Sequence, residues 1–117
     1  MADTMNKMIV AALKPFGLPI AEVLYAGAEK EFFTYNLAAD FAADNGDNLP
    51  QAYVASIQVH YICPWEKPYA DMRRRIRKAL ICAGATPPSI ADASDPAERI
   101  RHFVFEFELE NDYDLEE

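Results

Sequence analysis

Near the C-terminus, apolar and polar residues alternate, which is the pattern of a β-strand with one buried face. The segment is "RIRHFVFEFELEN", residues 99–111. Its apolar face carries Phe103, Phe105, Phe107 and Leu109. Its polar face carries His102, Glu106, Glu108 and Glu110. One face of this strand is therefore expected to lie in the core and the other in water.

Three earlier segments are also predicted as strands. "AYVASIQVHYIC", residues 52–63, alternates in the same way. It has Tyr53, Ala55, Ile57, Val59 and Tyr61 on one face, and Ser56, Gln58 and His60 on the other. "LPIAEVLYAG" and "EKEFFTYNLA", residues 18–27 and 29–38, are rich in β-branched and aromatic residues around a turn at Gly27. Both carry apolar residues at each parity, so the pattern does not give their register.

Two other segments repeat apolar residues every three or four positions, which predicts amphipathic helices. The first stripe consists of Met5, Met8, Ile9, Ala12, Leu13 and Phe16. Asp3 or Thr4 is expected to cap its start, and Pro15 and Gly17 to close it. The second helix begins near Pro68 and ends at Gly84. Its stripe consists of Tyr69, Met72, Ile76, Leu80 and Ala83.

The remaining segments are predicted as loops and a tail. Turn-forming residues crowd residues 38–50, which we interpret as a long polar loop. Its candidate mobile assembly residues are Asp40, Asp44, Asn45, Gly46, Asp47 and Asn48. "TPPSIADASDPAE", residues 86–98, is a second loop, and the acidic tail 111–117 is expected to fray.

These elements follow the order α-β-β-β-α-β, which predicts an α+β fold with a single domain over residues 1–110. The simplest architecture is an antiparallel sheet of about four strands with two helices packed mainly on one face. The Phe103–Leu109 face should then pack against two helix stripes. These stripes are Met8, Ile9 and Leu13 in the first helix, and Met72, Ile76 and Leu80 in the second.

Composition restricts the partners. The 117 residues carry a formal net charge of −8 and are 51% hydrophobic, which is typical of one globular domain. A negative chain is poorly suited to broad binding of nucleic acid or anionic membranes. The two cysteines, Cys63 and Cys82, have no neighbouring cysteine or histidine with zinc-site spacing, so both are expected to be reduced packing residues. The N-terminal "MADTMNKMIV" shows no signal pattern, and synthesis in a cytoplasm is expected.

No residue pattern predicts an enzyme or a cofactor. The four glycines are scattered, no serine lies in a G-x-S-x-G turn, and neither cysteine has an electropositive setting. His60 and His102 lie at the polar parity of their strands and would be neighbours if these strands pair. Glu106 and Glu108 share the face of His102, so a metal site was considered, but no ligand pair has a recognised spacing. Solvated surface histidines are the commoner interpretation.

The second helix concentrates basic residues. Six of the 11 Lys and Arg residues lie between Lys67 and Lys78, and 17 of the 19 Asp and Glu residues lie outside residues 66–78. The candidate interface consists of Arg74, Arg75, Arg77, Lys78 and Ile81. An ordinary solvated helix face explains the cations, but Ile81 projects from the middle of them. Two alternatives remain: an interface with an acidic protein surface, for which the acidic segment 106–117 of a second copy is suited, and phosphate contacts with Trp65 and Tyr69 nearby for stacking.

The order and spacing of these segments resemble a family of small siphophage neck proteins, the tail-completion, head-to-tail joining or tail-terminator proteins. The resemblance covers about residues 5–110 and is one of overall pattern. It is carried by "MIVAALKPFGLPI", "AEKEFFTYNL", "ADNGDN", "IQVHYICPWEKPY", "ALICAGA" and "RHFVFEFELE". The chain departs from the family in having Ala83-Gly84-Ala85 where a Gly-Phe ending is common, and in a longer acidic extension after Leu109.

The resemblance implies an α+β fold and a structural, non-enzymatic role in a phage or prophage. Such a protein completes the tail end, joins it to the head through other neck and tail proteins, and commonly self-associates into a ring in the virion, although many members of the family are monomers before assembly. It would lie in the virion neck after synthesis in the bacterial cytoplasm, without membrane or sequence-specific nucleic-acid binding. The alternatives are a small acidic regulator or inhibitor that binds a host protein, and a ligand-binding α+β domain.

Overall fold

The computed structural model describes residues 2–42 and 53–111, and the side chains of residues 6–39 and 54–109. Its helices are α1 (Ala2–Leu13), the short 3-10 helix η1 (Lys14–Phe16) and α2 (Ala70–Cys82). Its strands are β1 (Ile20–Glu22), β2 (Phe32–Ala42), β3 (Tyr53–Pro64), β4 (Ser89–Asp92) and β5 (Ile100–Asn111). The strands form one sheet in the order β1-β2-β3-β5-β4.

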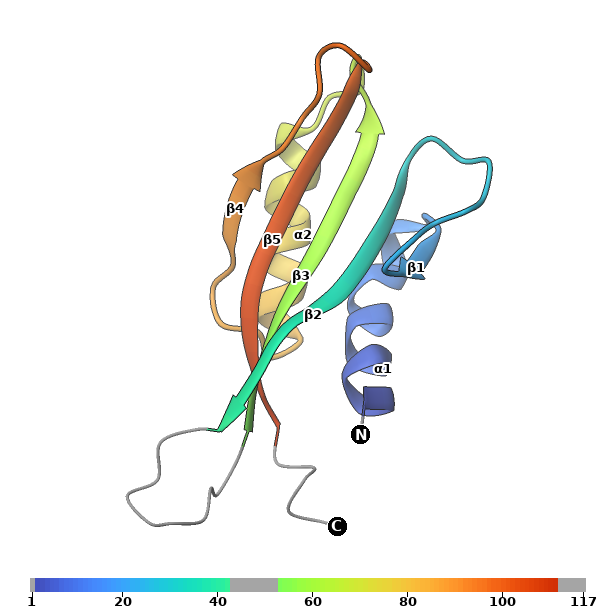
Figure 1. Ribbon diagram of the computed structural model, residues 1–117. Helices are drawn as coiled ribbons and strands as arrows, with labels where there is room; N and C mark the ends of the chain where they lie inside the picture. Colours follow the sequence, from blue (N-terminus) through green and yellow to red (C-terminus); the bar gives the residue numbers. More distant parts are fainter. Residues whose placement is uncertain (1, 43–52, 112–117) are drawn as a thin grey trace.

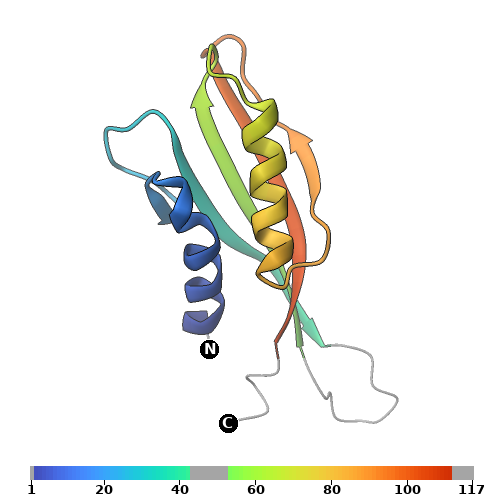
Figure 2. The ribbon, with the colours of Figure 1, turned by 180° about the vertical axis from the view of Figure 1, so that it is seen from behind.

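The chain is therefore an α+β protein, as predicted, but its sheet is mixed and has five strands. β1 runs parallel to β2, and the other neighbours are antiparallel. Both helices lie on the same side of the sheet, which Figure 2 shows from the helix side and Figure 1 from the other side. The other side of the sheet carries no helix, and we call it the open face. α2 crosses β3 and β5, and α1 lies beside β2 (Figure 2).

The predicted core is confirmed. The register places Val59 opposite Phe105 and Tyr61 opposite Phe103, so the apolar faces of β3 and β5 coincide. The side chains less than a tenth exposed on these strands are Ala55, Ile57, Val59, Tyr61, Cys63, Phe103, Phe105, Phe107 and Leu109. Ile9 and Leu13 of α1, and Ile76 and Leu80 of α2, are buried against them, with Met8 and Met72 partly buried. Apolar burial on this face is the main force that holds the two helices to the sheet.

Gly84 ends α2, as predicted. Its φ of 110° is a backbone conformation that side chains other than glycine rarely adopt. The Gly84 N–H donates to the Ile81 carbonyl at 3.0 Å, and the Ala85 N–H donates to the Leu80 carbonyl at 3.1 Å. These two bonds form a Schellman motif, which satisfies carbonyls at the helix end and turns the chain back toward the sheet.

A buried tyrosine ties the long loop between β1 and β2 to the core. The Tyr61 hydroxyl donates to Glu31 Oε2 at 2.5 Å, and Glu31 also pairs with Lys67 Nζ at 3.1 Å. Burial, together with the Glu31 hydrogen bond, raises the pKa of Tyr61 above its usual value, so the hydroxyl remains a donor. The loop thus meets the segment that leads into α2.

Several predicted boundaries were wrong. The segment 18–27 contributes only Ile20–Glu22 as a strand, and this strand is parallel to β2 rather than forming a hairpin with it. Residues 38–42, predicted as loop, continue β2, because Ala39 to Ala42 pair with Tyr53 to Ser56 after an irregularity at Leu37. Asp40 is therefore a strand residue. Asp44, Asn45, Gly46, Asp47 and Asn48 lie outside the described residues.

Four other differences are local. β4 lies inside the predicted loop 86–98, where Ile90 packs on the core and the pairing with β5 provides the strand. α1 begins at Ala2, so Asp3 and Thr4 belong to its first turn and do not precede it as caps. Cys82 is exposed, so only Cys63 is the buried packing residue that we expected of both. Asn111, predicted as the first residue of the tail, belongs to β5, and residues 112–117 lie outside the described residues.

We predict that Phe105→Ala lowers the free energy of unfolding by about 3–5 kcal/mol, because it leaves a cavity where β3, β5 and α2 meet. Val104→Ala, on the half-buried open face of the same strand, should cost distinctly less. Urea denaturation of both variants measures the difference. Equal losses would contradict the assignment of the Phe105 face as the core.

Candidate functional site

The candidate interface lies on the solvent side of α2. Ile76 and Leu80 of this helix are buried, and its basic residues point away from the sheet. The exposed side chains are Arg74, Arg75, Arg77, Lys78 and Ile81, as predicted from the helical period. Ile81 is 43% exposed and lies among these cations.

The four cations differ in what already contacts them. Arg74 forms an ion pair with Asp71, one turn earlier in α2. Arg75 lies over the Phe16 ring, with its guanidinium carbon 5.1 Å from the ring centroid. Arg77 and Lys78 form no ion pair with any described residue. They precede Ile81 by four and three positions, so they flank it on the helix surface. The free cationic charge of the face is thus concentrated beside Ile81.

The aromatic residues near this helix are engaged by arginines of the chain itself. Arg101 lies over Trp65, 3.8 Å from the ring centroid, and over Tyr69 at 4.8 Å. Tyr69 also stacks on Phe103, with centroids 4.9 Å apart. The Arg101 side chain donates to the Trp65 carbonyl at 3.2 Å as well. These contacts join the end of β3, the start of α2 and β5, which gives Trp65 and Tyr69 a structural role and weakens the base-stacking alternative.

The two histidines are neighbours on the open face, as the pairing of β3 with β5 requires. His60 Nδ1 and His102 Nε2 are 2.8 Å apart. His60 Nε2 lies 3.0 Å from Asn36 Oδ1, and Asn36 Nδ2 donates to Gln58 Oε1 at 3.3 Å. A chain of hydrogen bonds therefore crosses β2, β3 and β5. No sequence pattern indicated Asn36 as a partner, because the register of β2 was not readable.

Burial disfavours the charged form of both rings. Burial lowers the pKa of His60 below its usual 6.5, and the neighbouring His102 lowers it further. Burial also lowers the pKa of His102, although the carboxylate of Asp92 partly opposes this shift. Glu106, which was considered as a metal ligand beside His102, accepts a hydrogen bond from Ser56 instead. Within residues 6–39 and 54–109, no three His, Cys, Asp or Glu side chains are placed to hold a metal ion.

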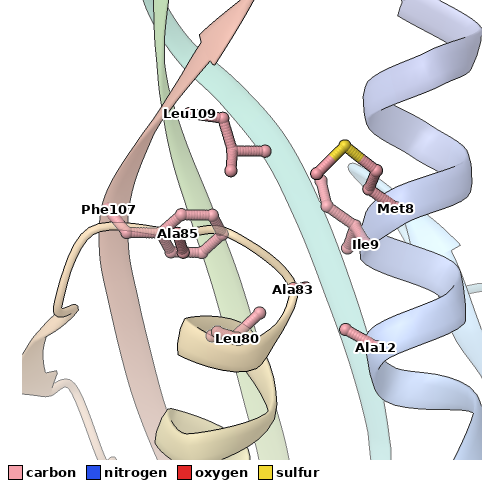
Figure 3. A pocket seen from close by; sticks show the side chains of 8 residues that line it. All are labelled: Met8, Ile9, Ala12, Leu80, Ala83, Ala85, Phe107 and Leu109. Carbon is pink, nitrogen blue, oxygen red and sulfur yellow. The ribbon is translucent and has the colours of Figure 1, made fainter.

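Two of the cavities lie against apolar side chains of the sheet. A space of about 10 Å³ between α1, α2 and β5 is lined only by apolar residues, which Figure 3 shows converging from the three elements. This is smaller than the room that a water molecule needs, so it is a gap in packing. A larger hollow of about 520 Å³ includes Phe32, Ile62 and Ile100, and Glu29, Glu98 and Arg99 among its lining. Neither includes a histidine.

None of the described helices has the length and apolar character needed to cross a lipid bilayer. No protein-family model matches the sequence, and the search of curated proteins found no match. Nineteen solved chains match the structure. One of them, which carries no descriptive name, superposes with a TM-score of 0.60 over 95% of both chains at 12% sequence identity. At this identity the likeness shows a shared α+β fold.

We predict that acid destabilises the protein because of the histidine pair. The pKa of each ring is lower in the folded chain than the usual 6.5 of an unfolded one, so the unfolded chain binds more protons below that pH. The free energy of unfolding should fall as the pH decreases from 7.5 to 5.5. Urea midpoints measure this, and the double variant His60→Asn/His102→Gln should respond less. Identical pH dependence in both proteins would contradict this source.

Proposed function

We propose that this chain is a structural component of the neck of a tailed phage or prophage, which completes the tail end and joins it to the head. Two features support the proposal. One is the resemblance of the segment pattern over about residues 5–110 to the tail-completion and head-to-tail joining proteins. The other is the α+β architecture, in which two helices share one side of the sheet, because it agrees with the fold that the resemblance implies.

The observation that carries the proposal is the exposed face of α2. Arg77 and Lys78 flank the exposed side chain of Ile81 in a chain of net charge −8. An apolar residue beside unpaired cations suits a contact whose centre is desolvated and whose rim attracts an acidic surface. A protein that joins two assemblies needs such a contact, whereas an isolated globular protein gains nothing from it.

The partner surface is acidic and belongs to another neck or tail protein or to a second copy of this chain. Glu106 and Glu108 are exposed on the open face, on the side of the sheet away from α2. A basic helix on one side and acidic residues on the other suit head-to-tail self-association into a ring. In this proposal the protein acts without cofactor or catalysis, and it contacts no membrane and reads no DNA sequence.

The central experiment is complementation of a phage whose gene for this chain is deleted. Arg77→Glu/Lys78→Glu should fold normally, because exposed charges away from caps contribute little to stability. It should lower the yield of joined, infectious particles at least tenfold, because like charges would then meet at the contact. Lys7→Glu/Lys14→Glu is the matched control: it changes the net charge equally on the exposed side of α1 and η1, and should complement normally.

A second pair of variants tests the apolar centre. Ile81→Asp should reduce particle yield, whereas Leu24→Asp, at a residue that is 75% exposed in the β1–β2 loop, should not. Electron microscopy of the lysates should show separate filled heads and tails for the defective variants. If the deletion itself leaves particle assembly intact, the neck role is wrong and a regulator that binds a host protein becomes the better hypothesis. If only the deletion has an effect, the role stands and the α2 surface is wrong.

A further inference from the structure

The hydrogen-bonded chain on the open face determines which nitrogen of each histidine carries a proton. The amide oxygen of Asn36 can only accept, so His60 Nε2, 3.0 Å away, must be the donor. In the same orientation of Asn36, its amide nitrogen donates to Gln58 Oε1. In the neutral His60 ring, Nδ1 is then a bare acceptor. His102 Nε2, 2.8 Å away, must therefore carry the proton of the bond between the two rings.

This arrangement treats the two rings differently when acid is added. A proton on Nδ1 of His102 leaves its Nε2–H in place, so the bond to His60 is kept and becomes charge-assisted. A proton on Nδ1 of His60 puts two N–H groups against each other and removes the only acceptor of the bond. The second proton also makes both rings positive. Because His60 Nδ1 and His102 Nε2 lie only 2.8 Å apart, the two rings then repel each other.

The charged surroundings favour the same order. Among the side chains that the structure describes, those that extend the hydrogen-bonded chain from the histidine pair are the neutral Asn36 of β2 and the neutral Gln58 of β3. On β5, Glu106 lies on the same face, opposite Gln58, and bonds to Ser56. On β4, the carboxylate of Asp92 acts on His102 and raises its pKa against the effect of burial. The helices pack on the other side of the sheet (Figure 2).

We propose that the His60–His102 pair takes up its first proton at His102 without changing the open face, and that a second proton, on Nδ1 of His60, breaks the bond across β3 and β5. The pair is thus a two-step acid sensor on the face that the helices leave uncovered. The first step changes only charge, and the second separates the rings and releases the chain through Asn36. The inference does not depend on the proposed function.

Long-range proton–nitrogen NMR correlation of the imidazole rings tests the order directly. At pH 8 both rings should show a protonated Nε2 and a bare Nδ1. On acidification, Nδ1 of His102 should protonate first, with little change in the backbone amide shifts of Asn36 and Gln58. These amides should move only when His60 protonates. A protonated Nδ1 in either ring at pH 8, or titration of His60 before His102, would overturn the proposal.

Two single variants separate the steps. In His60→Asn, the side-chain oxygen stands near the position of Nδ1 and accepts from His102 Nε2–H whatever the charge of that ring. His102 should then titrate while the acid response of the Asn36 and Gln58 amides disappears. In His102→Gln, the amide keeps a donor for His60, so the first step should vanish and the second remain. Melting temperatures at pH 8 establish that both variants fold. The titration of the wild-type protein tests the proposal even if a variant does not fold. An unchanged amide response in His60→Asn would show that His60 is not the switch.

Discussion

The structure depends on the pairing of β3 with β5 in a single register. This register puts Val59 opposite Phe105 and Tyr61 opposite Phe103, so that two alternating strands present one continuous apolar surface. A slip of one residue would turn the apolar row of one of the two strands to water, which makes that pairing costly. The two helices do not share a comparable apolar surface with each other. Their buried residues, including Leu13 and Ile76, pack in the same core as the apolar side chains of these two strands.

The same register creates the polar arrangement of the open face. Because side chains alternate across a strand, burying Phe103 and Phe105 commits His102 and Glu106 to the other side of the sheet. His60 follows from Tyr61 in the same way, and the pairing then brings the two histidine rings within hydrogen-bonding distance. The histidine pair is thus a consequence of core packing, and its sensitivity to acid is tied to strands that the core holds in place. A proton that separates the rings acts on the two central strands that form the core.

α2 links the core to the surface. Its buried side is held by Ile76 and Leu80, its start by Tyr69 stacked on Phe103, and its end by the backbone bonds around Gly84. A helix fixed at both ends and along one side presents its opposite face rigidly, so Arg77, Lys78 and Ile81 keep a defined spacing. Binding to a rigid surface loses less conformational entropy than binding to a mobile one. This rigidity supports the α2 surface as a candidate interface.

The sequence by itself determined the two strongly alternating strands, both amphipathic helices, the core residues and the exposed cations of α2. The reason is that an element buried on one face must repeat apolar residues at its own period, and this repeat can be read from the sequence. Only the tertiary structure decided where the short strands lie and which side chains contact each other across the fold. Ile20–Glu22 and Ser89–Asp92 are too short for a period, and they are strands because a neighbour supplies their hydrogen bonds. A tertiary contact also distinguished Arg75, which lies over the Phe16 ring, from Arg77 and Lys78. Asn36 meets His60 for the same reason: these contacts join residues far apart in the chain, and local pattern contains no information about what lies opposite.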